Sequence, residues 1–160
     1  MQLGSTVRTI IGLGRSVAMA TLLLLVLVQL ANVVARYIFG ASFIWVQELA
    51  IYFHAATIAL GCGGTLLADK HVRVDVIYNR FTASKKRSLD RLGFVAFGAP
   101  LLAAILYLCA PYVLHSWQIL EASAEVSGLP GLFLIKSLLI LLGVLLVLAG
   151  LVSFFRPKVG

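Results

Sequence analysis

Apolar residues along this chain of 160 amino acids gather into four long runs, which short polar stretches separate. The runs cover residues 16–38, 47–68, 92–115 and 131–155. Each run is long enough to cross the hydrocarbon core of a bilayer as a helix. We therefore expect an all-α integral membrane protein with four transmembrane helices, forming a single membrane domain over residues 1–160. The first run is too long for the core of a cleaved signal peptide, so we interpret it as a retained helix.

The spacing of particular residues predicts which helix faces pack against protein. Gln29, Asn32 and Arg36 follow one another at three and four residues, so they share one face near the far end of the first run. Polar groups in hydrocarbon need partners, and we expect this face to meet protein rather than lipid. In the second run a repeat of small residues at every fourth position favours close approach of another helix. Its members are Ala55, Ala59 and Gly63.

The segment 69–91 is the only sizeable polar stretch, and it holds seven of the thirteen lysine and arginine residues. Its apolar residues Val74, Ile77, Tyr78 and Phe81 recur with a helical rhythm, which is typical of a helix lying in the membrane interface. A solvated loop is the alternative. Further on, Pro100 is expected to kink the third helix.

The distribution of cations predicts the orientation of the chain. Two precede the first run, seven lie between the second and third, and two follow the fourth, whereas the first connection has one and the third has none. The positive-inside rule therefore places both termini and the middle segment in the cytoplasm.

Composition agrees with a membrane protein. Hydrophobic residues make up 61% of the chain, charged residues only 12%, and the net charge is +7. The cations flank apolar runs, where orientation in a membrane explains them, so we reject nucleic-acid binding. Cys62 and Cys109 lie in separate runs without metal-ligand spacing, and we interpret them as buried small residues.

The sequence offers little catalytic chemistry. It has no hydrolase or transferase constellation, and we expect no enzymatic activity, no metal and no cofactor. Ionisable groups at mid-membrane depth, which a channel or carrier needs, are almost absent, and this argues against an independent small carrier. One alternative is a haem-binding anchor of a redox complex, in which His54 and His115 would ligate one haem.

Three stretches resemble a known family. They are R-Y-I-F-G-A-S-F-I-W-V-Q-E-L from position 36, H-V-R-V-D from position 71, and E-A-S-A-E-V-S-G-L-P from position 121. Together with the four-helix layout they resemble the small membrane subunit of tripartite ATP-independent periplasmic (TRAP) transporters, the DctQ-like family. The candidate structural and partner-contact residues in these stretches are Arg36, Trp45, Glu48, His71, Asp75, Glu121 and Glu125.

The resemblance implies a role and partners. It implies a subunit of the bacterial inner membrane that braces a much larger membrane subunit. The large subunit would carry sodium and a substrate, usually a carboxylate, and a periplasmic substrate-binding protein would deliver that substrate at the outer face.

Two local contacts are also predicted. Arg36 ends the first helix and Glu48 begins the second, so we expect them to interact directly or through the large subunit, with Trp45 packed beside them. Glu121 and Glu125 are four residues apart, so we expect them to share one helical face.

Overall fold

The computed structural model describes residues 2–68, 78 and 81–155, with only the backbone described for 2–5, 83 and 87. Four of its helices are long and apolar enough to cross a membrane, which confirms the predicted all-α membrane architecture. The elements are α1 (Gln2–Phe39), α2 (Ile44–Leu67), α4 (Ala83–Gly93), the π-helical turn η1 (Phe94–Gly98), α5 (Ala99–Gln118) and α6 (Leu132–Phe155).

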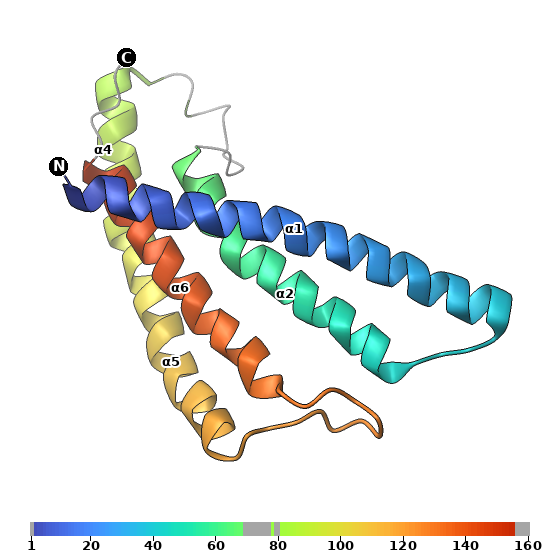
Figure 1. Cartoon of the computed structure of the whole chain (residues 1–160). Coiled ribbons are helices and arrows are strands. Elements are labelled where there is room, and N and C mark those ends of the chain that lie inside the picture. Colours follow the sequence, from blue (N-terminus) through green and yellow to red (C-terminus); the bar gives the residue numbers. More distant parts are fainter. Residues whose placement is uncertain (1, 69–77, 79–80, 156–160) are drawn as a thin grey trace.

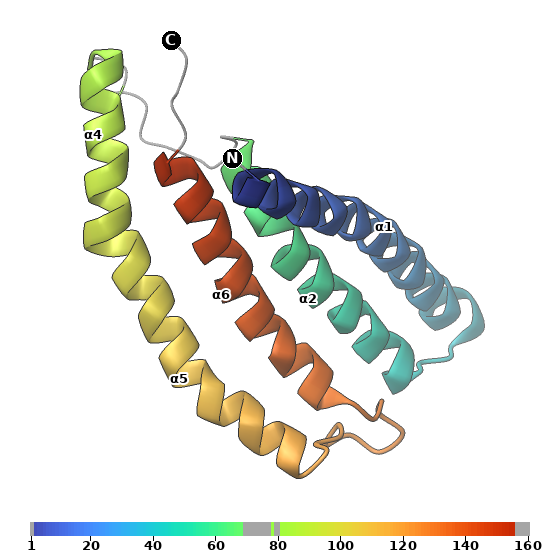
Figure 2. The same ribbon diagram turned by 60° about the vertical axis from the view of Figure 1, so that its left-hand side comes forward.

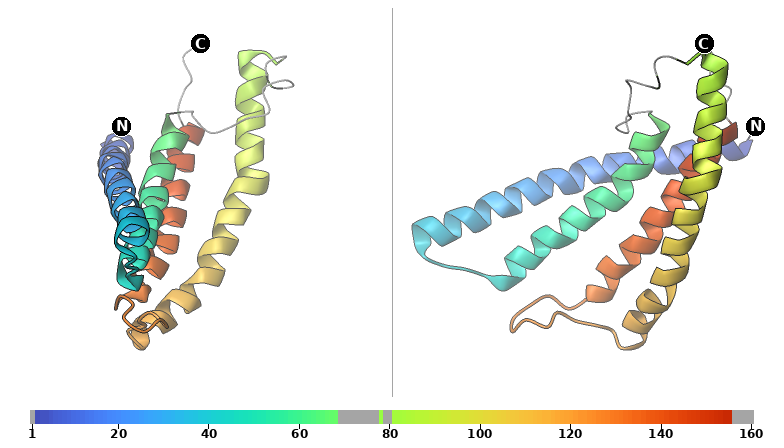
Figure 3. Two further views of the ribbon diagram at one scale, coloured as in Figure 1. Left: turned by 90° about the vertical axis from the view of Figure 1, so that its right-hand side faces the viewer. Right: turned by 180° about the vertical axis from the view of Figure 1, so that it is seen from behind.

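The helices lie side by side in the order α1, α2, α6 and α5 (Figures 1 and 2). The connections 40–43 and 119–131 lie at one end of this row, which we call the loop end. The beginning of α1 and the end of α6 lie at the opposite end, here called the terminal end (Figure 3). Because each helix packs mainly on its neighbours in the row, much of its surface is left for lipid or a partner.

α1 packs along α2 through residues spaced three and four apart, the repeat of a helix–helix seam. Ile11, Ala18 and Asn32 are buried in this series. Midway along the seam, the hydroxyls of Thr21 and Thr57 are hydrogen-bonded to each other at 2.9 Å. Each also lies within hydrogen-bond distance of a carbonyl of its own helix, so one hydroxyl donates across the seam and the other donates within its helix. This polar link joins the two helices at a depth where water is absent.

α2 packs along α6 through small residues, as the four-residue repeat predicts. Ala59 is 2% exposed, and a Cβ added to Gly63 would lie 3.5 Å from both the Cβ and the backbone oxygen of Leu145. Leu145 and Ala149 of α6 also meet Ile11 of α1, and these three residues form the buried apolar cluster of the fold. The small residues therefore let two backbones come close where a third helix crosses them.

The third crossing begins earlier than its apolar run. From Ala83 onward, the described residues form one long helix through α4, η1 and α5. Figure 2 shows α4 extending beyond α6 at the terminal end, with a bend before α5. The π-helical turn ends at Gly98, two residues before Pro100, which lacks an N–H to donate, so the bend lies where a kink is predicted.

Two of the four residues in the apolar rhythm of the middle segment, Val74 and Ile77, lie outside the described residues. Tyr78 is described, and its hydroxyl donates to the Asp90 carboxylate of α4 at 2.8–2.9 Å. Thr82 precedes α4, but its side chain makes no capping hydrogen bond.

α1 is much longer than its apolar run. The basic N-terminal residues are helical as well, so the helix has 38 residues and a length of about 57 Å. The hydrocarbon core is about 30 Å thick, so α1 either tilts strongly or extends beyond the membrane. Hydropathy marks the part of a helix that fits lipid and not the point where the helix ends.

Candidate functional site

Polar side chains concentrate in two places at the loop end, and the first is organised by Glu48. This residue lies in the second turn of α2 and faces the connection 119–131. One carboxylate oxygen accepts a hydrogen bond from the Ser123 hydroxyl, and the other accepts one from the backbone N–H of Leu129. A single carboxylate therefore holds two points of the connection against α2. We call this arrangement the Glu48 anchor.

The connection itself is folded tightly around the anchor. Ala122 and Pro130 form an antiparallel bridge, and the N–H of Ser123 donates to the Leu129 carbonyl at 3.2 Å. Gly128 lies so close that an added Cβ would collide with the Ser123 side chain and lie 2.8 Å from the nearer Glu48 oxygen. Only glycine fits this position without displacing the anchor.

An ion pair lies next to the anchor, between α5 and α6. Lys136 Nζ donates to the Glu121 carboxylate and lies 4.0 Å from the centroid of the Tyr112 ring. The hydrogen bond from Lys136 lowers the pKa of Glu121 from its ordinary value. The Lys136 side chain therefore packs against Tyr112 and binds the Glu121 carboxylate of the same chain, and does not extend only into solvent.

The predicted pair of Glu121 and Glu125 on one helical face is wrong. Both residues lie in the irregular connection, because α5 ends at Gln118 and α6 begins at Leu132. Glu121 binds Lys136, while Glu125 is exposed. A spacing of four residues has this meaning only inside a helix.

The direct form of the predicted Arg36–Glu48 pair is also not observed. Arg36 donates to the Ser42 hydroxyl at 3.4 Å, and Glu48 is occupied by the anchor. Trp45 is half exposed and packs beside Phe43, with ring centroids 6.4 Å apart. A link between Arg36 and Glu48 through another subunit stays a prediction.

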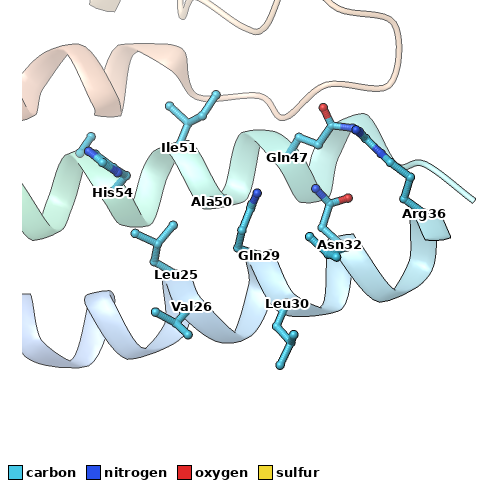
Figure 4. A pocket seen from close by; sticks show the side chains of 12 residues that line it. Leu25, Val26, Gln29, Leu30, Asn32, Arg36, Gln47, Ala50, Ile51 and His54 are labelled. Atoms are coloured by element: carbon cyan, nitrogen blue, oxygen red, sulfur yellow. The ribbon is translucent and has the colours of Figure 1, made fainter. Parts of the chain in front are cut away.

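The second polar region is a groove between α1 and α2, with a cavity volume of about 980 Å³. Figure 4 shows Gln29 and Asn32 pointing from α1 toward α2, with Gln47 of α2 near Arg36 at the loop end. Gln47 donates to Ser42 at 3.0 Å, as Arg36 does at 3.4 Å. We call this region the α1–α2 groove. Its walls include Val26, Gln29, Arg36, Gln47, Ile51 and His54, and the buried Asn32 lies on its floor.

Polar groups of the α1–α2 groove lack partners among the residues that the structure describes. Asn32 is 7% exposed, and its Oδ1 accepts no hydrogen bond there. Gln29 and His54 are exposed, and within the described ranges neither side chain forms a hydrogen bond or ion pair. The sequence predicted that the face with Gln29 and Asn32 meets protein, and this unsatisfied groove is where that face lies.

The two described histidines, His54 and His115, lie on helices that α6 separates (Figure 1). His54 borders the α1–α2 groove and a cavity between α2 and α6, whereas His115 lines neither. In the described part of the chain, no three histidine, cysteine or acidic residues cluster as metal ligands would. His71 and Asp75 lie outside the described residues.

Sequence reasoning missed the partners of Glu48. Ser123 and Leu129 are 75 and 81 positions away, and helical spacing carries no information about such contacts. One sequence feature could have drawn attention to this contact: Ser123 and Gly128 belong to the E-A-S-A-E-V-S-G-L-P stretch, which is one of the three that resemble the family. The ion pair between Lys136 and Glu121 was not predicted from the sequence either.

The fold and these polar regions define the class of the protein as a multi-pass membrane protein with a structured loop end. Residues 25–158 match the family model described as tripartite ATP-independent periplasmic transporters, DctQ component. The chain therefore belongs to the DctQ family of TRAP transporter components, as its motifs indicated.

A curated relative agrees with this assignment. Over 86 residues the chain is 33% identical to the C4-dicarboxylate TRAP transporter small permease protein DctQ of Rhodobacter capsulatus. The aligned region covers 54% of this chain but only 37% of that relative. No solved structure matches the chain.

Proposed function

We propose that this protein is the small membrane subunit of a TRAP transporter, and that it braces the large subunit during sodium-driven uptake of an organic acid from a periplasmic binding protein. The match of residues 25–158 to the DctQ component carries the proposal. In this role the chain catalyses no reaction and contributes a fixed surface. The substrate and the sodium ions are bound by the large subunit.

The distribution of charged side chains favours a structural role over a transport pathway in this chain. Arg36, Glu48 and Lys136 lie toward the ends of their spanning helices, and His54, near the middle of α2, is an exception. A transport pathway needs polar groups through the full depth of the membrane, often on broken helices. The middle of α6 is instead a run of leucine, valine and glycine.

Reconstitution tests the proposal. Proteoliposomes with this chain alone should take up no organic acid under a sodium gradient, even with the binding protein present. Adding the large subunit should give uptake that falls at least tenfold when this chain is omitted. Uptake by this chain alone, or uptake by the large subunit at full rate without it, would contradict the proposal.

We also propose that both termini lie in the cytoplasm and the loop end in the periplasm. The cation distribution supports this orientation, because α4 and the segment before it hold seven lysine and arginine residues. In a variant with Cys62 and Cys109 replaced by alanine, a cysteine at Ser127 should react in whole cells with a membrane-impermeant maleimide. A cysteine at Ser84 should react only after lysis. The reverse pattern would show the opposite orientation.

A further inference from the structure

The α1–α2 groove has an unusual combination of depth and unsatisfied polarity. Gln29 lies seven residues from Arg36 along α1, which is about 10 Å deeper from the loop end. Neither Gln29 nor His54 finds a hydrogen-bond partner among the described residues, and Asn32 keeps a buried, unpaired oxygen on the floor. Lipid tails offer no hydrogen bonds, so lipid alone is a poor occupant of this groove.

The two flanks of the α1–α2 pair differ in chemistry. The groove flank of α1 carries Gln29 and Arg36, and that of α2 carries Gln47 and His54. Helical spacing places only apolar residues on the opposite flank. They are Val17, Leu24, Val28 and Ala31 of α1, and Leu49, Phe53, Ala56 and Leu60 of α2. The aliphatic flank suits lipid, and the polar flank suits protein.

The groove flank is as long as a membrane is thick. Toward the terminal end, a second cavity of about 530 Å³ continues between α1 and α2, with Arg15 and Leu22 on one wall and Gly61 and Thr65 on the other. The distance along α1 from Arg15 to Arg36 is 21 residues, or about 31 Å. The hydrocarbon core is about 30 Å thick, so the length fits a helix that spans the membrane.

Charge defines the chemistry of the occupant. Arg36 lies at the loop end of the groove and Arg15 at the other end, and the described residues place no carboxylate in either cavity. An occupant therefore needs an acidic side chain at the level of Arg36. It also needs an amide or hydroxyl at the level of Gln29 and His54, where hydrogen bonds in lipid are formed between helices.

We propose that the α1–α2 groove is the docking site for one transmembrane helix of the large subunit, which carries a carboxylate facing Arg36 and a hydrogen-bonding side chain facing Gln29 and His54. This proposal rests on the proposed function and adds to it the face and the chemistry of the interface. Arg36 then has its carboxylate partner on another chain, while Glu48 stays in its anchor.

Paired tryptophan substitutions test the docking site. Val26 lies on the groove flank and Leu24 on the aliphatic flank, and both side chains are exposed. Val26→Trp should reduce co-purification with the large subunit at least tenfold, because its ring fills the groove. Leu24→Trp should leave co-purification within twofold of wild type. Circular dichroism of each variant in detergent shows whether its helices are intact.

A photo-crosslinking amino acid gives a second measurement that does not depend on disrupting the groove. Placed at Val26 it should crosslink to the large subunit, and placed at Leu24 it should not. Crosslinking from both positions alike, or assembly that tolerates Val26→Trp, overturns the docking site. Native mass spectrometry that finds a lipid displaced by Val26→Trp, with the complex intact, also overturns it in favour of lipid. A wild-type chain that never assembles with the large subunit overturns the proposed function together with the docking site.

Discussion

The Glu48 anchor and the α1–α2 groove lie at the same end of the molecule, and both are rich in polar side chains, yet they differ in how those groups are satisfied. In the anchor, one carboxylate binds two donors of the same chain, and Lys136 nearby meets Glu121. In the groove, Gln29, His54 and the Asn32 oxygen find no partner among the described residues. Polar groups satisfied within the chain stabilise its own fold, whereas unsatisfied ones at depth indicate contact with something else.

The first prediction breaks the anchor and has the largest effect. Glu48→Ala removes the acceptor of the Ser123 hydroxyl and of the Leu129 N–H, two partly buried donors, and a buried donor left unsatisfied costs about 1–3 kcal/mol. We expect a loss of this size or greater in the free energy of unfolding, measured by titration with sodium dodecyl sulfate. Glu125→Ala is the matched control, since that side chain is exposed, and it should stay within about 0.5 kcal/mol of wild type. Equal effects of the two variants would show that the anchor does not stabilise the fold.

The second prediction concerns a variant that adds side-chain volume at the same site. Gly128→Ala places a methyl group against Ser123 and Glu48, and overpacking of this kind costs about 1–3 kcal/mol. The connection should loosen without unfolding the helices. In a Trp45→Phe background Trp117 is the remaining tryptophan, and its indole N–H donates to Ser137 near the connection. A looser connection should therefore let a soluble quencher reduce the Trp117 fluorescence more strongly. Gly12→Ala is the control, since an added Cβ there meets nothing within 4 Å. Unchanged quenching in Gly128→Ala would contradict the tight packing of the anchor.

Much of the fold was predictable because lipid selects a simple pattern. The apolar runs gave α2 and α6 to within three residues at each end, since the helix and its hydrophobic part nearly coincide. They underestimated α1 and the third crossing, whose basic residues continue the helix beyond the apolar part. A charged residue can be helical without being in lipid, so hydropathy alone does not define these ends.

The polar regions were predictable only where the relevant residues share one helix. The face with Gln29 and Asn32 was identified from spacing, and the groove lies there. The direct contact of Glu48 with Arg36 is not observed, because closeness along the chain does not show which groups lie nearest in space. Ser123 reaches Glu48 through a connection whose backbone includes two non-glycine residues with positive φ, Leu120 and Ser127, and no periodicity encodes such a path.

The third prediction concerns pH and the ion pair beside the anchor. Lys136 lowers the pKa of Glu121, so the folded state binds a proton at this carboxyl less readily than the unfolded chain does. The stability that the pair contributes is therefore fully present above the ordinary pKa of 4.5, and it is lost as the pH falls through the lowered folded-state value. The difference in melting temperature between wild type and Glu121→Gln should be constant near neutral pH and shrink in acid. A difference between wild type and Glu121→Gln that stays constant through the acid range would contradict the pair.

The smallest effect on the isolated chain is expected in the α1–α2 groove, and it sharpens the comparison most. Gln29 forms no hydrogen bond in the described parts of the chain, so Gln29→Leu removes no interaction that the fold uses. Its free energy of unfolding should stay within about 0.5 kcal/mol of wild type, as for other exposed substitutions, and hydrophobic burial in detergent favours leucine slightly. Thr21→Val is the contrast, because the Thr21 hydroxyl is hydrogen-bonded to Thr57 across the seam, and such hydrogen bonds between membrane helices average about 0.6 kcal/mol.

Assembly with the large subunit should reverse the order of the two variants: Gln29→Leu should weaken assembly severalfold, and Thr21→Val should leave it nearly unchanged. If Gln29→Leu instead destabilises the isolated chain as much as Thr21→Val does, the groove is part of the fold of the subunit, and the distinction between the two polar regions fails.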